Sequence, residues 1–154
     1  MRNLLLESIR QADGRYFNDT ELQPLERYVS SFAVRFNTYS LLKDNSDTLI
    51  LQTLRKLVQS HRRMVQEHGE KCQRDMAYTL SCISKAVLLD DEPGFIEGYV
   101  LWMQNITRAL HKEASAIEAY RLLQGEIAAT FPADSARLIN HHLESLIKAL
   151  STVA

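Results

Sequence analysis

Four residues close together in the sequence, Lys71, Cys72, Arg74 and Asp75, carry side chains that could do chemistry as a group. A cysteine that only fills a core has apolar neighbours, whereas Cys72 lies among charged ones. Cationic neighbours and the start of a helix both lower the pKa of a thiol, so we expect Cys72 to be a reactive thiolate. Cys72 and Asp75 are three residues apart and share one helix face, whereas Arg74 points elsewhere.

The composition fits one globular domain, because 154 residues with 45% hydrophobic content are enough to build a sizeable core. A net charge of −1 argues against a dedicated nucleic-acid binder, which would be clearly basic. No apolar run approaches the roughly 20 residues of a membrane span, and Glu7 interrupts the N-terminal leucines before they could form a signal peptide. We therefore expect a cytoplasmic protein in which Cys72 and Cys82 are free thiols.

Apolar residues recur at helical spacing along nearly the whole chain, which predicts an all-α fold of seven or eight helices. Asn18 and Glu21 have the spacing of a capping box, and Gly69 predicts a break before a long helix that carries Cys72. That helix should end at the acidic turn Asp90-Asp91. Further helices are expected over 48–59 (capped by Asn45-Ser46-Asp47), 95–111, 115–130 and 136–150 (opened by Asp134-Ser135).

The stretch CQRDMAYTLSCISKAVLLDD, from Cys72 to Asp91, resembles the chromophore helix of the phycobiliproteins, the bilin-carrying antenna subunits of phycobilisomes. Its Cys-x-Arg-Asp start is the most specific part of the resemblance. The segment ADGRYFNDTELQPLERYVSSF is similar to the family's leading helical hairpin, and EGYVLWMQNITRAL is similar to the helix that follows the chromophore helix. The resemblance covers nearly the whole chain and is nearest to the allophycocyanins, among which we expect a divergent, β-type member.

This resemblance implies a globin-like helical bundle with an N-terminal helical hairpin extension, as a single domain over residues 1–154. Residues 1–33 would form the hairpin used for subunit association, and residues 34–154 the globin-like core. The implied partners are other phycobiliprotein subunits or a second copy of the chain, together with a bilin lyase. The implied location is the cytoplasmic phycobilisome, peripheral to the thylakoid surface. Apolar side chains on the hairpin (Leu5, Tyr16, Phe17 and Tyr28) also predict self-association.

The resemblance further implies one covalently bound cofactor, phycocyanobilin or a related bilin, for light harvesting and energy transfer or a related photoactive role. Cys72 would form a thioether with it, Asp75 would accept hydrogen bonds from its inner-ring N–H groups, and Arg74 would clamp a propionate. The expected bilin-binding residues are Cys72, Arg74, Asp75, Lys71, Tyr78, Met76 and Thr79, with the last three as walls of the pocket.

Several positions depart from the family pattern, since Ser81 and Lys85 stand where the family has Arg and Tyr. Thr107 replaces a Tyr that the family has near the pocket. These departures leave open a second interpretation, in which the chain is a bilin-free structural or regulatory partner of phycobilisomes.

A haem globin is a third interpretation, in which His61 or His68 would ligate the iron. It suffers from the lack of any histidine between Cys72 and Asp91, where a proximal ligand belongs. The adjacent pair His141-His142 points in two directions and makes a poor metal site. We expect no enzyme activity, because no Ser/His/Asp set or phosphate loop is evident. Cys82 is expected in the core, and Trp102 and Met103 in the core or at the far end of the pocket. The cluster His61-Arg62-Arg63 is expected in solvent, with the alternative that it steadies a propionate.

Overall fold

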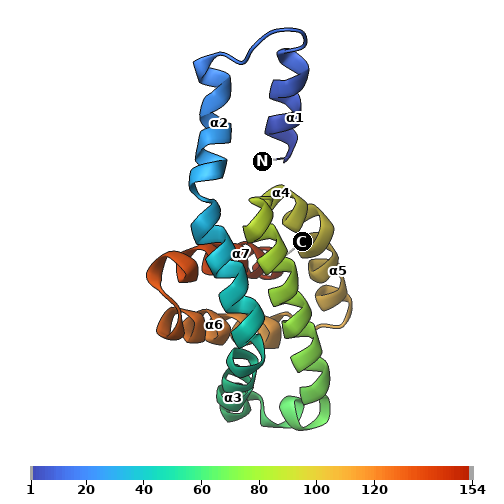
Figure 1. Cartoon of the computed structure of the whole chain (residues 1–154). Coiled ribbons are helices and arrows are strands. Elements are labelled where there is room, and N and C mark those ends of the chain that lie inside the picture. The colour runs from blue at the N-terminus through green and yellow to red at the C-terminus, as the bar shows by residue number, and fades with distance from the viewer. Residues whose placement is uncertain (1, 153–154) are drawn as a thin grey trace.

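The structure, a computed structural model, describes the backbone of residues 2–152 and the side chains of residues 5–152. Every regular element in that part of the chain is a helix, which confirms the all-α class (Figure 1). The elements are α1 (Arg2–Gln11), α2 (Asp19–Ser30), α3 (Phe32–Leu89), α4 (Glu92–Phe95), the π-helical turn η1 (Ile96–Val100), α5 (Leu101–Ala109), α6 (Glu113–Thr130) and α7 (Ala133–Ser151).

Helices α1 and α2 form a hairpin that projects beyond the rest of the molecule (Figure 1). Gly14 allows the tight turn between them, since its φ of 74° lies in the left-handed region. The predicted capping box is confirmed: Asn18 Oδ1 accepts from the Glu21 N–H at 2.9 Å, and Glu21 Oε2 accepts from the Asn18 N–H at 2.9 Å. Arg15 adds an ion pair to Glu21 at 2.7 Å. Because α2 buries none of its residues, these local contacts carry much of the hairpin's order.

Helix α3 turns back on itself, so that its later part runs upward beside its earlier part (Figure 1). The backbone leaves helical geometry at His61 (φ −127°, ψ 46°) and at His68 (φ −134°, ψ 17°). The break that we predicted at Gly69 therefore lies one residue earlier, and a break at His61 accompanies it. We call the section from Gly69 to Leu89 the return arm. It ends at Asp90, whose φ of 51° stops the helix at the predicted acidic turn.

The helix start that we predicted at Asn45-Ser46-Asp47 is wrong, because these residues lie inside α3. Asn45 Nδ2 donates to the Leu41 carbonyl at 2.9 Å, and the Ser46 hydroxyl donates to the Leu42 carbonyl. Both side chains thus bond back to the preceding turn instead of capping a new one. Asp134 and Ser135 likewise lie within α7 and do not cap it; the Ser135 hydroxyl is buried and accepts from Thr38 Oγ1 at 2.8 Å.

The core lies where α3, α6 and α7 pack against one another. Its fully buried large side chains are Leu42, Leu49, Ile50, Leu57, Leu80, Ile83, Leu123, Ile127, Ile139, Leu143, Leu146 and Ile147. Each such side chain stabilises the fold by about 1.5–3 kcal/mol relative to its exposed state. The return arm is therefore held firmly by the face opposite to the one that its charged residues occupy.

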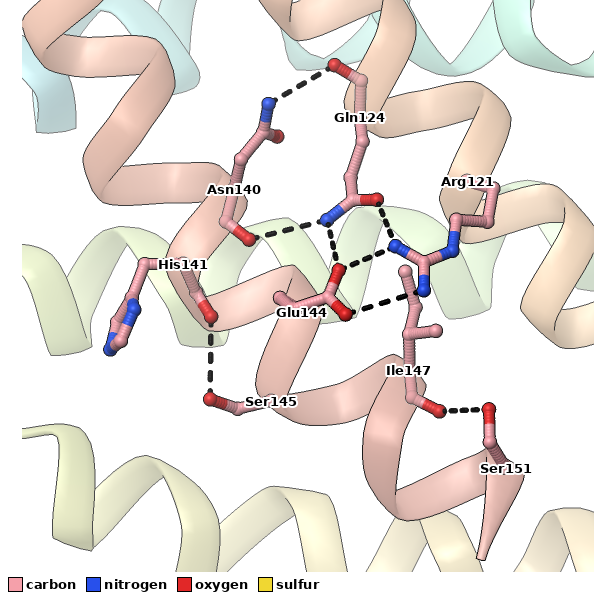
Figure 2. A network of polar contacts seen from close by, with 8 residues as sticks. All are labelled: Arg121, Gln124, Asn140, His141, Glu144, Ser145, Ile147 and Ser151. Carbon is pink, nitrogen blue, oxygen red and sulfur yellow. Dashed lines mark hydrogen bonds and ion pairs between the residues drawn. The ribbon is translucent and has the colours of Figure 1, made fainter.

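Polar contacts fix α6 against α7 at the rim of this core (Figure 2). Arg121 Nη1 donates to Glu144 Oε2 at 2.5 Å, and Gln124 Nε2 donates to the same oxygen at 3.2 Å. Asn140 Nδ2 donates to the Gln124 carbonyl at 3.2 Å. The hydrogen bond from Arg121 lowers the pKa of Glu144, so the carboxylate stays charged to a lower pH than an ordinary glutamate does. This network sets the rotation of α6, which presents Tyr120 to the return arm.

Arg35 joins the base of the hairpin to the end of the return arm. Its guanidinium is buried and donates to the Tyr28 carbonyl at 2.7 Å and to the Leu88 carbonyl. The guanidinium also lies 4.1 Å from the centre of the Tyr28 ring. One cation therefore satisfies carbonyls at the ends of both α2 and α3, where helices leave such groups unpaired.

Candidate functional site

A cavity of about 480 Å³ lies between the return arm, α5 and the start of α6. That volume is within the range of small-molecule binding sites, which run from about 300 to 1,000 Å³. Six of the seven residues that the sequence singled out line it: Lys71, Cys72, Arg74, Asp75, Met76 and Tyr78. They reach it together because the break at His68 starts the return arm just before them.

Thr79, the seventh, supports the wall from behind and is not a wall itself. Its side chain is fully buried, and its hydroxyl donates to the Asp75 carbonyl at 2.9 Å. The hydroxyl also lies 2.5 Å from Tyr99 Oη and 2.8 Å from Tyr120 Oη. Our expectation for Thr79 is corrected in this respect, since the residue faces two tyrosines on other elements.

The Cys72 thiol is half-buried and donates to Met64 Sδ at 3.5 Å. Burial raises the pKa of Cys72, and the nearby Asp75 carboxylate raises it further, while Lys112 and Lys71 oppose the shift. Our prediction of a lowered pKa is therefore wrong, because desolvation outweighs the two cations. The sulfur is present chiefly as a thiol near neutral pH.

Charged side chains that lack partners line the cavity and its mouth. Within residues 5–152, the side chains of Lys71, Arg74, Asp75 and Lys112 make neither a hydrogen bond nor an ion pair with the protein. Three cations and one carboxylate are thus left for a ligand, and a ligand that satisfies them needs anionic groups as well as a hydrogen-bond donor.

Aromatic rings line much of the interior. Tyr99 lies 5.6 Å from Tyr78, edge to face, and 6.1 Å from Trp102, measured between ring centres. Trp102 and Met103, which we expected in the core or at the far end of the pocket, line the cavity, and Trp102 is 51% exposed. These edge-to-face and tilted rings form an aromatic slot with largely apolar walls.

Thr107 adds an uncharged polar group to the set of side chains without a partner. The residue is buried and lines the cavity, yet among the described side chains its hydroxyl has no hydrogen-bond partner. A ligand or a water molecule in the cavity could therefore bond to this hydroxyl. The position where the family resemblance placed a tyrosine thus carries a smaller side chain, which leaves room in the slot.

Little in the sequence indicated which distant segments contribute to the cavity. Four residues that line the cavity belong to four different elements or turns: Met64, Tyr99, Lys112 and Tyr120. No local pattern marks them, because each takes part only through the packing of α5 and α6 on the return arm. The signal available was the aromatic content of 95–111 and 115–130, which is also typical of core residues.

The basic cluster at the bend of α3 lies beside the cavity. His61 Nε2 is 2.6 Å from Glu118 Oε2, which ties the bend to α6, whereas Arg62 and Arg63 are exposed as expected. This contact occupies one of the two histidines considered as iron ligands. The other, His68, lines the cavity. In the described part of the chain, no three His, Cys, Asp or Glu residues are grouped to hold a metal ion. His141 and His142 bond in different directions, to Glu92 and to the Leu138 carbonyl.

Comparison with known proteins identifies the family. A family model described as "Phycobilisome protein" matches residues 7–150. The chain belongs to the phycobilisome protein family. Family members are light-harvesting pigment proteins with a globin-like all-α fold, so the predicted resemblance and the globin-like architecture are both confirmed.

A curated relative supports this assignment at lower similarity. "Putative allophycocyanin subunit alpha 2" of Nostoc sp. (strain PCC 7120 / SAG 25.82 / UTEX 2576) is 24% identical over 159 residues. The match covers 96% of this chain and 99% of the relative. The relative is named as an α subunit, so the β-type character that we expected stays a prediction. None of the described helices is long and apolar enough to pass through a lipid bilayer.

Proposed function

We propose that this phycobilisome family protein holds one open-chain tetrapyrrole, phycocyanobilin or a related bilin, in the cavity beside Cys72. The observation that carries the proposal is the set of polar groups that line that cavity without a side-chain partner in the described part of the chain: Lys71, Arg74, Lys112, Asp75 and Thr107. A bilin has two propionates for the cations, ring N–H groups for the carboxylate and a flat apolar body for the aromatic slot. The bilin, when bound, supplies absorption of visible light.

The chain's own residues would divide the work of holding the pigment. Arg74 offers a planar fork to a propionate, and Lys71 and Lys112 offer point charges at the same mouth. Asp75 would accept hydrogen bonds from ring N–H groups, which are strongest when those rings are protonated. Tyr78, Tyr99 and Trp102 would restrict twisting of the rings, so that less excitation energy is lost as heat.

Attachment at Cys72 would be an addition of the thiol to a carbon–carbon double bond of the bilin's side chain. A sulfur–carbon bond forms, one carbon–carbon π bond breaks, and the thiol proton ends on the neighbouring conjugated position. No oxidant or reductant is required. Because its pKa is raised, Cys72 reacts slowly by itself. This favours delivery of the pigment by a bilin lyase as a partner.

The test uses the whole chain produced together with a bilin source. After denaturation, we expect zinc-induced fluorescence on the wild-type chain and its loss in the Cys72→Ala variant. Cys82→Ala is the matched control, because this second half-buried thiol does not line the cavity. Colour that is lost from the wild type on denaturation, or that persists in Cys72→Ala, contradicts covalent attachment at Cys72.

A second candidate function is that of a bilin-free structural or regulatory partner of phycobilisomes. The raised pKa of the Cys72 thiol favours it, together with Ser81 and Lys85, which replace the Arg and Tyr expected from the resemblance. Under this alternative, the chain co-purifies with antenna subunits while itself colourless. Absence of any such association counts against it.

We also propose that residues 1–33 mediate association with other phycobiliprotein subunits or a second copy, beside a globin-like core of residues 34–154. Supporting this, Tyr16 is 97% exposed, and Val29, Phe32 and Phe36 are exposed near the base of the hairpin. Leu5, Phe17 and Tyr28, also expected at this surface, are half-buried within the chain. The proposed location is the cytoplasmic phycobilisome at the thylakoid surface.

A further inference from the structure

Three hydroxyl groups from three different elements meet behind the cavity. Thr79 of the return arm, Tyr99 of η1 and Tyr120 of α6 are all at least 96% buried. Thr79 Oγ1 lies 2.5 Å from Tyr99 Oη, 2.8 Å from Tyr120 Oη and 2.9 Å from the Asp75 carbonyl oxygen. We call these three side chains the hydroxyl cluster.

Counting protons fixes the direction of these contacts. The Asp75 carbonyl only accepts, so the single proton of Thr79 must be donated to it. The two remaining lone pairs of Thr79 Oγ1 then accept one proton from each tyrosine. This is the one assignment in which all three contacts are hydrogen bonds. Both tyrosine protons are therefore committed to Thr79, and the tyrosine oxygens keep only their capacity to accept.

The tyrosines stay neutral in this arrangement. Burial raises the pKa of Tyr99 to about 12 and raises that of Tyr120 well above its ordinary value. Both residues line the cavity, and the Asp75 carboxylate lies one helical turn from Thr79 on the same arm. The part of the cavity next to Thr79 is thus lined by Asp75 and by two tyrosines whose hydroxyl protons are already donated to Thr79.

We propose that Thr79 is a positioning residue: by holding the protons of Tyr99 and Tyr120, it makes this end of the cavity a hydrogen-bond acceptor that selects the protonated, N–H-bearing edge of the pigment. Carbonyl and carboxylate groups of the ligand are disfavoured there and turn toward the cations at the mouth. The inference rests on the proposed function for its ligand. The arrangement of the hydroxyls is testable in the pigment-free protein.

The test compares Thr79→Val, which keeps the shape of the side chain but removes the acceptor, with Thr79→Ser, which keeps the hydroxyl. In pigment-free protein, ultraviolet resonance Raman spectra report whether tyrosine hydroxyls donate hydrogen bonds. We expect two donating tyrosines to lose that state in Thr79→Val and to keep it in Thr79→Ser. Unchanged tyrosine bands in Thr79→Val overturn the inference, whether or not the wild type binds a bilin.

The second readout is the pH at which the long-wavelength band of the bound bilin disappears as its rings lose a proton. Released tyrosine protons would oppose the protonated rings, so we expect this midpoint to fall by about one pH unit in Thr79→Val, a tenfold loss of proton affinity. Thr79→Ser should restore it. An equal midpoint in Thr79→Val and wild type refutes the inference and leaves the proposed function intact. If Thr79→Val does not fold, Tyr120→Phe takes its place, because it removes one of the two donating hydroxyls. We then expect the spectrum to lose the signal of one donating tyrosine and the midpoint to shift by a smaller amount. An unchanged midpoint refutes the inference.

Discussion

The reactivity of Cys72 depends on the groups around its sulfur. The Cys72 thiol donates a hydrogen bond to Met64 Sδ, and the two sulfur atoms are 3.5 Å apart. The thiol is half-buried, and the Asp75 carboxylate lies one turn further along the helix. Burial and the carboxylate raise the pKa, and Lys112 and Lys71 only partly compensate. The residue that would bind the pigment's N–H groups therefore also slows the thiol.

This competition predicts the behaviour of the Asp75→Asn variant. Removing the carboxylate should lower the pKa of Cys72 toward its ordinary value, so alkylation by iodoacetamide at pH 8 should become faster by a few-fold. The rate is measured by mass spectrometry in a Cys82→Ala background, which leaves one thiol. Glu70→Gln, an exposed neighbour that does not line the cavity, is the control. A rate equal to or below that of the parent would show that Asp75 has no such effect.

Burial is also the largest influence on the pKa of His142, which lies in the core. Burial lowers its pKa, which is opposed by the bond to the Leu138 carbonyl and by Glu92 and Asp90, while His141 lowers it further. Its Nδ1 lies 2.9 Å from the Leu138 carbonyl oxygen, and its Nε2 is buried without a partner in the part of the chain that the structure describes. The folded protein therefore binds this proton less readily than the unfolded chain does.

The sign of the resulting pH dependence follows directly. As pH falls through the ordinary range of histidine, the unfolded chain takes up the proton first, so the free energy of unfolding decreases until the lowered pKa of the folded state is passed. We predict that His142→Leu has a smaller drop in Tm between pH 7 and pH 5.5 than the wild type. The control is His111→Asn, because His111 is exposed and its φ of 51° suits asparagine. An undiminished drop in His142→Leu would contradict the assignment.

At the scale of elements, the sequence allowed good prediction wherever the deciding contacts are local. The Asn18–Glu21 capping box and the acidic turn after Leu89 involve residues within three or four positions of one another. The wrong start at Asn45-Ser46-Asp47 arose because the same side chains can cap a helix or bond back into one. Tertiary packing decides between these two outcomes. It also determines the bend at His61 and the π-helical turn that buries Tyr99, so neither could be predicted from local sequence.

The capping box gives a prediction at this scale. Because α2 has no buried residues, Asn18→Ala should leave the Tm of the core unchanged and loosen only the hairpin. Loss of a cap costs about 1 kcal/mol, which is roughly a fivefold change in an opening equilibrium. Hydrogen exchange should therefore quicken by about that factor in the amides of α2, whereas those of α7 should be unaffected. Equal exchange in α2 of both proteins would show that the cap does not hold the hairpin.

At the scale of the whole molecule, the base of the hairpin and the first turns of α3 leave apolar side chains in water. Val29, Phe32 and Phe36 are 63%, 48% and 52% exposed, and the rings of Phe32 and Phe36 stack at 5.9 Å. Such a surface fits association with a second copy of the chain or with a related subunit.

We predict that removing residues 1–17 lowers the mass observed by sedimentation velocity, since α1 and the exposed Tyr16 are lost while the capping box remains. A matched Leu51→Ser variant alters an exposed apolar residue elsewhere and should keep the parental mass. An unchanged mass of the truncated protein contradicts the proposed role of the hairpin.

The candidate site itself was predictable only along one helix. Cys72 and Asp75 share a face because of helical spacing, and the sequence resemblance supplied the role of Arg74. Lys112, Tyr99 and Tyr120 reach the cavity from segments 20 or more positions away, through packing that no local pattern encodes. Their effects on Cys72 and Thr79 therefore could not be foreseen from the sequence.

Arg35 links the hairpin to the return arm. Its buried guanidinium donates to the Tyr28 carbonyl of the hairpin and to the Leu88 carbonyl in the last turn of the return arm. A neighbouring subunit that tilts the hairpin would therefore also displace the end of the return arm, the helix segment on which the proposed pigment site is built. The absorption spectrum of a bilin-bound protein would then report whether the hairpin has a neighbouring subunit, without any added label.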